Sequence, residues 1–168
     1  MVRNVLVFGV SGIGKTTLIR EVMSDPDYGG DNKYIFHEYT SDIECDGKPK
    51  NTKQLKDFIK QSCTPDIVLF VVERGRILRH DIANWNLLHT VIEKHKTPVI
   101  VIVNHCEQNS DGNLDSWCID NTPTYHKSGI VPTKFVGISF CYGNKFIGDP
   151  YSELRCASRK ALLSCLSL

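Results

Sequence analysis

The sequence predicts an α/β fold, in which a mostly or wholly parallel sheet of about five strands lies between two layers of helices. Short apolar runs alternate with segments of helical periodicity, which is the pattern of successive β–α units. The apolar runs are continuous, as in DIVLFVV at 66–72, and this is typical of strands buried on both faces. The 168 residues, with 41% hydrophobic composition, are expected to form one domain spanning 1–168.

Each expected element rests on its own pattern. Strands are expected where β-branched and aromatic residues cluster, at 4–9, 33–39, 66–72, 98–104 and 134–140. Helices are expected where apolar residues recur every three or four positions, at 15–23, 51–63, 80–95 and 152–166. Asn51 is the expected N-cap of the second helix. The polar stretch 106–132 is expected to be irregular, with room for one short helix.

Composition argues against several classes of protein. A net charge of +1 gives no global field for nucleic acid or for an anionic membrane, so neither is an expected partner. The longest apolar run is too short to span a bilayer, and the first residues do not form a secretory signal. Seven dispersed cysteines without a Cys-x-x-Cys pair favour reduced, mostly buried thiols. We therefore expect a soluble, cytoplasmic protein.

The last four residues, CLSL, match the prenylation pattern C-a-a-X. No polybasic run precedes them, and Cys165 shares a helical face with Leu154 and Ala161. We expect Cys165 to face the core rather than to carry a lipid.

A glycine-rich stretch, GVSGIGKT at 9–16, matches the phosphate-binding pattern G-x-x-x-x-G-K-S/T between an expected strand and an expected helix. Backbone N–H groups of such a turn and the helix N-terminus face phosphates. We expect Lys15 to reach the β- and γ-phosphates and the Thr16 hydroxyl to ligate Mg²⁺. The expected phosphate site comprises Gly9, Val10, Ser11, Gly12, Ile13, Gly14, Lys15, Thr16 and Thr17. In this setting the motif predicts a P-loop NTPase fold.

A second motif concerns the base of the nucleotide. The expected strand at 98–104 runs into NHCE, where guanine-specific domains carry N/T-K-x-D. The acidic residue of that motif accepts two hydrogen bonds that adenine cannot donate. Asn104 keeps the first position, His105 replaces the lysine and Glu107 replaces the aspartate. The later stretch VGISF resembles the final guanine-binding loop, which places Ser139 and the backbone of Phe140 and Cys141 near the base. GTP or GDP is therefore the expected ligand.

Four segments together resemble a known family: FGVSGIGKTTLI, PDIVLFVVERGRILRHD, VIVNHCE and VGISF. In this order they resemble the septin-like GTPases (TRAFAC class) that comprise the immunity-associated, or avirulence-induced, proteins and the GTPases of the chloroplast outer-envelope import complex. The resemblance covers most of the chain and implies that His105 packs against the base. It also implies that Arg79 matches an arginine that, in the import GTPases, reaches the partner's nucleotide in a homodimer. A solvated basic loop is the alternative for Arg74, Arg76 and Arg79.

The stretch between the first expected helix and DIVLFVV departs from that family. A Ras-like domain carries a switch threonine, an edge strand and a D-x-x-G motif there, whereas this chain has YTSD after a single strand. We therefore expect five parallel strands instead of six mixed ones, as in a shortened member of the family. Glu38, Thr40 and Asp42 lie near the strand end that faces the phosphates, where each is either a substitute metal ligand or an ordinary residue.

Three functions remain open. The first is a guanine-nucleotide-binding protein that hydrolyses GTP slowly, with Lys15, Thr16 and Arg79 as expected catalytic residues and a homodimer across the nucleotide face as expected assistance. The second is a nucleotide-binding scaffold without turnover, because the metal-shell aspartate and the γ-phosphate sensor are not identifiable. The third is an ATP-dependent small-molecule kinase, which would need an arginine-rich lid and an acceptor pocket that do not stand out.

Overall fold

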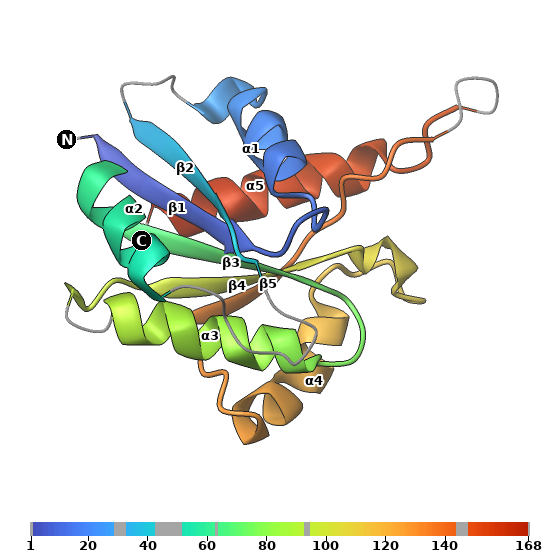
Figure 1. The fold of residues 1–168 in the computed structure, drawn as a ribbon. Helices are drawn as coiled ribbons and strands as arrows, with labels where there is room; N and C mark the ends of the chain where they lie inside the picture. Colours follow the sequence, from blue (N-terminus) through green and yellow to red (C-terminus); the bar gives the residue numbers. More distant parts are fainter. Residues whose placement is uncertain are drawn as a thin grey trace.

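Five strands form one wholly parallel sheet in the order β2-β1-β3-β4-β5 (Figure 1). They are β1 (Arg3–Gly9), β2 (Tyr34–Thr40), β3 (Ile67–Glu73), β4 (Val99–Asn104) and β5 (Lys134–Gly137). This computed structural model describes residues 2–28, 33–42, 52–62, 64–92, 95–143 and 148–167. The expected parallel sheet of five strands is confirmed.

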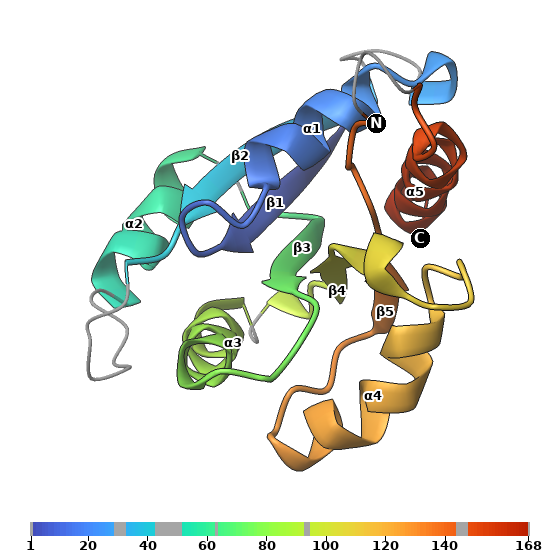
Figure 2. The same cartoon turned by 90° about the vertical axis from the view of Figure 1, so that its right-hand side faces the viewer.

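Helices cover both faces of the sheet (Figure 2). One face carries α1 (Lys15–Met23) and α5 (Ser152–Leu166), and the other carries α2 (Thr52–Ser62), α3 (Arg79–Ile92) and α4 (Ser116–Lys127). Alternation along β1 explains the two layers, because successive side chains of a strand point to opposite faces. Val5 and Val7 pack toward α1 and α5, whereas Leu6 and Phe8 pack toward the other three helices. The three-layer α/β/α architecture is confirmed.

The stretch 106–132 is more regular than the sequence indicated. It holds a short 3₁₀ helix, η3 (Cys106–Gln108), and the three-turn helix α4. Two features of the sequence obscure the helical pattern of α4. Pro123 lies inside the helix, where its ring removes a backbone donor, and the buried residues of the helix are Cys118 and Tyr125. A second 3₁₀ turn, η1 (Pro26–Tyr28), follows α1. The expected N-cap Asn51 lies outside the described residues.

Five cysteines lie within the described ranges, and all five are free thiols. Three of them are buried, including Cys165, whose side chain faces the core as expected. Burial raises the pKa of the Cys165 thiol. Cys45 and Cys63 lie outside the described residues. Within the described ranges, none of the helices combines the length and the apolar character needed to cross a bilayer.

Candidate nucleotide-binding site

The predicted site residues gather at the carboxyl edge of the sheet. Gly9, Glu73 and Asn104 end the three neighbouring strands β1, β3 and β4, and Glu73 pairs directly with Asn104. Loops that leave the carboxyl ends of parallel strands form the crevice in which α/β proteins bind ligands. The topology therefore brings the glycine-rich turn and the NHCE segment to one place.

Glycines shape the turn between β1 and α1. Gly12 and Gly14 have φ values of 76° and 98°, a region that other residues rarely adopt. Gly14 is the N-cap of α1 and makes no side-chain cap, so the backbone N–H groups of the first helical turn point into the crevice. A Cβ at Gly9 would lie 2.8 Å from the carbonyl oxygen of Val71. The turn thus has the form of an anion-binding cradle.

Lys15 is held over this turn. Its Nζ donates a hydrogen bond of 2.7 Å to the carbonyl oxygen of Val10, and its side chain is only 3% exposed. Burial lowers the pKa of Lys15, and the Glu38 carboxylate, 4.0 Å away, opposes that shift. A buried ammonium group beside a row of backbone donors is suited to a polyphosphate.

Glu38 reaches the first turn of α1 from β2. The parallel register pairs Val7 with Glu38, and the Thr16 hydroxyl lies 2.9 Å and 3.1 Å from the two carboxylate oxygens. Together with Thr40 and the glycine-rich turn, these side chains line a cavity of about 310 Å³. Of the three residues weighed as substitute metal ligands, Glu38 contacts Thr16, Thr40 lines the cavity, and Asp42 does neither.

The chemistry of this donor set fits Mg²⁺. A hydroxyl and a carboxylate oxygen are hard ligands, which Mg²⁺ prefers, and they lie beside the cradle where phosphate oxygens would complete the shell. Thr16 and Glu38 are therefore the residues that could hold the ion.

Asn104 connects the predicted base-recognition end, which comprises residues 104–107 and the loop after β5, to the glycine-rich turn. Its Nδ2 donates 3.1 Å to the carbonyl oxygen of Ile13, and its Oδ1 accepts 2.9 Å from the backbone N–H of His105. A Cβ at position 14 would lie 2.7 Å from Nδ2 of Asn104. The absence of a side chain at Gly14 therefore makes room for this bridge.

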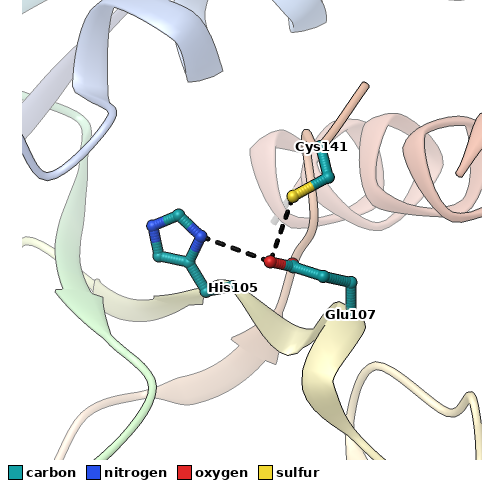
Figure 3. Close-up of side chains that lie close together, drawn as sticks. All are labelled: His105, Glu107 and Cys141. Atoms are coloured by element: carbon teal, nitrogen blue, oxygen red, sulfur yellow. Dashed lines mark hydrogen bonds and ion pairs between the residues drawn. The ribbon is translucent and has the colours of Figure 1, made fainter. Parts of the chain in front are cut away.

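Three side chains meet beyond Asn104 (Figure 3). His105 has a left-handed backbone, with φ of 68°, and its Nδ1 lies 3.4 Å from Oε1 of Glu107. The Cys141 thiol, from the loop after β5, donates 3.1 Å to the same oxygen. Burial, followed by the hydrogen bond to Glu107, raises the pKa of Cys141 to about 11, so the thiol is protonated at neutral pH.

The other carboxylate oxygen of Glu107, Oε2, has different surroundings from Oε1. Oε2 is buried, and none of the described residues donates a hydrogen bond to it. Burial alone would raise the pKa of Glu107, but the Cys141 thiol, the backbone N–H of Glu107, the nearby Ser139 hydroxyl and the neighbouring His105 together lower it below the usual value for glutamate. An ionised carboxylate with one buried, unpartnered oxygen is a site for a ligand that donates hydrogen bonds or positive charge.

The loop after β5 is fixed against α5. The backbone N–H of Ser139 donates 2.8 Å to the Ser158 hydroxyl, and the guanidinium of Arg155 donates 2.7 Å to the carbonyl oxygen of Cys141. Ser139 is fully buried, and the side chain of Phe140 packs into the core. The loop is joined to the NHCE segment just before these residues, because the backbone N–H of Cys106 donates 3.0 Å to the carbonyl oxygen of Ile138.

The arginines of the ERGRILRHD segment have different surroundings. Arg74 donates 2.8 Å to Oδ1 of Asn109 and stacks over Trp117. Arg74 and Arg76 line a second cavity, of about 320 Å³, together with residues 10–13 of the glycine-rich turn. Arg79 is exposed at the start of α3 and is not among the lining residues. The exposed side chain of Arg79 therefore follows Leu78 and precedes His80, two residues that line this cavity, without lining it itself.

One functional side chain was missed in the sequence. Cys141 was expected to contribute only its backbone, but its thiol contacts Glu107, 34 residues earlier. Nothing in the local sequence around Cys141 signals this contact, which exists because β4 and β5 are neighbours in the sheet.

The fold and the glycine-rich turn are those of P-loop NTPases. No family model matches the chain, and no curated protein matches its sequence. Solved structures do match. Era from Aquifex aeolicus, bound to GDP and AlF4⁻, is 19% identical over 95% of this chain and 56% of the other, with a TM-score of 0.52.

Two further structures agree. Era in complex with MgGDPNP and a segment of 16S ribosomal RNA is 19% identical, over 95% of this chain and 56% of the other, with a TM-score of 0.50. A variant of SsGBP is 15% identical, over 99% of this chain and 57% of the other, with a TM-score of 0.51. The chain spans little more than half the length of these proteins. It has the fold of the P-loop GTPases, and the narrower resemblance to the septin-like family stays a prediction.

Proposed function

We propose that this chain binds guanine nucleotides, with the phosphates in the turn 9–17 and the base at Glu107. The observation that carries the proposal is the buried Oε2 of Glu107, which has no hydrogen-bond partner among the described residues and lies beyond the bridge from Asn104 to the glycine-rich turn. Guanine presents two adjacent N–H donors to such a carboxylate, whereas adenine presents none of that pattern. The Era structures hold GDP or MgGDPNP, and the shared fold supports the same class of ligand here.

Thr16 and Glu38 are the proposed holders of Mg²⁺. The ion, when bound, would neutralise charge on the β- and γ-phosphates. Lys15 would add a second positive charge from the opposite side of the turn, because its Nζ already lies over the Val10 carbonyl. Glu38 would replace the aspartate of the D-x-x-G motif, which this chain lacks.

Turnover is proposed to be slow. Positioning and electrostatic stabilisation supply most of the rate in phosphoryl transfer. Within the described part of the chain, neither cavity beside the turn is lined by a glutamine that could position the attacking water. Arg79 points to solvent, where it is available to a second copy of the chain. Arginine supplied across a homodimer is the proposed source of any acceleration.

The base specificity is tested by titrating the nucleotide-free protein with fluorescent GDP and fluorescent ADP. The wild type should prefer GDP, and Glu107→Ala should lower the affinity for GDP about 100-fold while leaving that for ADP unchanged, since two hydrogen bonds to a charged acceptor are lost. Gln108→Ala is the matched control, because Gln108 is the exposed neighbour of Glu107. Equal affinity of the wild type for both nucleotides would contradict guanine binding.

A scaffold that holds nucleotide without turnover is the second candidate. The contact between Glu38 and Thr16 favours it, because the hydroxyl that would ligate Mg²⁺ is already hydrogen-bonded to a carboxylate. Phosphate release at high protein concentration separates the candidates. Release that is lost in Arg79→Ala, with nucleotide affinity intact, favours the dimer-assisted enzyme, whereas no release from either protein favours the scaffold.

A further inference from the structure

The cluster formed by His105, Glu107 and Cys141 contains more donor atoms than guanine recognition uses. Imidazole nitrogen, carboxylate oxygen and sulfur come from three residues on two loops, and their ligand atoms all lie within 4.8 Å of one another (Figure 3). A base-reading carboxylate needs neither the thiol nor the imidazole at this distance. These three groups are, however, the usual protein ligands of zinc.

The spacing of the donor atoms is close to that of a tetrahedral metal site. Ligand distances of about 2.1 Å for nitrogen and oxygen place those two atoms about 3.4 Å apart, and a sulfur at about 2.3 Å lies about 3.6 Å from the oxygen. The distance from His105 Nδ1 to Glu107 Oε1 is 3.4 Å, and that from Cys141 Sγ to Glu107 Oε1 is 3.1 Å. The third distance, from His105 Nδ1 to Cys141 Sγ, is at most 4.8 Å. Side-chain rotations that bring the nitrogen and the sulfur to about 3.6 Å from one another would therefore complete the tetrahedral arrangement.

Burial and charge also suit a cation. The Glu107 side chain is 10% exposed, and its buried Oε2 has no hydrogen-bond partner among the described residues. The His105 side chain is 41% exposed, which leaves an open side for a water molecule as fourth ligand. The guanidinium of Arg155, which donates to the Cys141 carbonyl, is also engaged by the Asp149 carboxylate.

We propose that His105, Glu107 and Cys141 bind a borderline-soft divalent transition-metal ion such as Zn²⁺, and that this ion competes with the guanine base. On binding, the sulfur–hydrogen bond of Cys141 breaks, the proton passes to solvent, and the thiolate coordinates the metal. The site is distinct from the Thr16 and Glu38 pair, whose oxygen ligands suit Mg²⁺. Metal binding stands independently of the proposed function, whereas the competition rests on it, since both ligands need the Glu107 carboxylate.

Cobalt titration of the reduced, nucleotide-free full chain tests the metal site. Co²⁺ reports tetrahedral geometry through intense visible bands and thiolate ligation through a near-ultraviolet charge-transfer band. We expect both for one equivalent of Co²⁺, their loss in Cys141→Ser, and their retention in Cys156→Ser, a half-buried cysteine on α5. No charge-transfer band in the wild type, or a band that persists in Cys141→Ser, would overturn the proposal.

A second variant keeps the test independent of folding at the buried thiol. His105→Asn removes the imidazole while keeping a residue that tolerates the left-handed backbone. We expect its affinity for Co²⁺ to fall at least about tenfold with an unchanged circular dichroism spectrum, as for loss of one ligand. Unchanged affinity would overturn the assignment of His105.

Competition is measured by titrating fluorescent GDP, in excess Mg²⁺, with and without Zn²⁺. Zn²⁺ should weaken GDP binding to the wild type at least about tenfold, as expected when one ligand excludes the other. The same Zn²⁺ should leave the affinity of Cys141→Ser unchanged, and this comparison corrects for chelation of Zn²⁺ by the nucleotide itself. Cobalt binding without any effect on GDP overturns the competition. Cobalt binding by a protein that does not bind GDP overturns the proposed function and leaves the metal site standing.

Discussion

The glycine-rich turn and the predicted base-recognition end lie at one edge of the sheet, but backbone groups form the first and side chains form the second. The turn is made of backbone, with glycines at the positions of positive φ and one buried ammonium group. The base-recognition end is made of side chains that meet from β4, η3 and the loop after β5. A backbone cradle depends on local sequence alone, whereas a side-chain cluster depends on which strands are neighbours. This difference explains why the glycine-rich turn matches the common phosphate-binding pattern, whereas the NHCE segment departs from the usual guanine-binding motif.

The largest expected effect comes from the charged group of the turn. Lys15→Met should lower the affinity for GDP about 100-fold or more, because at least two charge-assisted hydrogen bonds to phosphate are lost. The melting temperature of the nucleotide-free variant should equal or exceed that of the wild type. Burial lowers the pKa of Lys15, which means that the folded protein disfavours its charge, and methionine keeps the apolar stem without that charge. Fluorescent GDP titration and thermal melting measure the two quantities. Lys127→Met, at the exposed end of α4, is the control.

Undiminished affinity in Lys15→Met would show that the turn does not hold phosphate. The comparison between the glycine-rich turn and the base-recognition end would then lose its functional basis, because binding of a nucleotide would support neither assignment.

The hydrogen bond from Asn104 to the Ile13 carbonyl predicts that substitutions at positions 14 and 104 have coupled effects on stability. Gly14→Ala places a methyl group 2.7 Å from Nδ2 of Asn104 and forces alanine to φ of 98°. We expect a loss of about 2–3 kcal/mol in unfolding free energy, from backbone strain and steric overlap together. In an Asn104→Ala background the overlap disappears, so the same change should cost about 1 kcal/mol less. Urea unfolding of the wild type, the two single variants and the double variant gives a double-mutant cycle. If the two losses of unfolding free energy are strictly additive, the contact between position 14 and Asn104 is refuted.

Glu38→Gln tests the proposed Mg²⁺ site at Thr16 and Glu38, beside the glycine-rich turn. The amide keeps an acceptor for the Thr16 hydroxyl but loses the charge. We expect Mg²⁺ to enhance GDP affinity about tenfold less than in the wild type, in line with the loss of one charged interaction with the ion. Asp42→Asn, on the same side of the turn but outside the cavity, should behave as the wild type. Equal Mg²⁺ dependence in Glu38→Gln would leave Thr16 as the sole protein ligand.

The sequence predicted the backbone half of the site well and the side-chain half in part. The parallel sheet and the position of Lys15 follow from periodicity and from a motif whose glycines have local conformational roles. Glu38 could be named only as one of three residues, because the register of β2 against β1 decides which one faces Thr16. The Cys141 thiol was missed, since its contact with Glu107 depends on the pairing of β4 with β5. One short helix was expected somewhere in 106–132, but the bounds of α4 were not predicted, because its polar surface and Pro123 obscure the helical periodicity.

The smallest expected effect concerns the support of the base-recognition end. Arg155 holds the carbonyl of Cys141 and pairs with Asp149, and this guanidinium lowers the pKa of Asp149 to about 2. A lowered carboxyl pKa gives stability that is present above the unfolded value, near pH 4, and is lost as pH falls toward 2. Asp149→Asn should therefore lower the melting temperature slightly at pH 7, with a difference from the wild type that shrinks between pH 4 and pH 2.

The Asp149 carboxylate is exposed, so water screens the pair and the shift in melting temperature at pH 7 should be no more than about a degree or two. Asp120→Asn, an exposed change on α4, is the control for the pH dependence of the whole protein. If the difference between Asp149→Asn and the wild type is the same at pH 7 and pH 2, the ion pair does not form. The loop that carries Cys141 would then be held by the Arg155 to carbonyl hydrogen bond alone, and the base-recognition end would depend less on charge than the phosphate turn does.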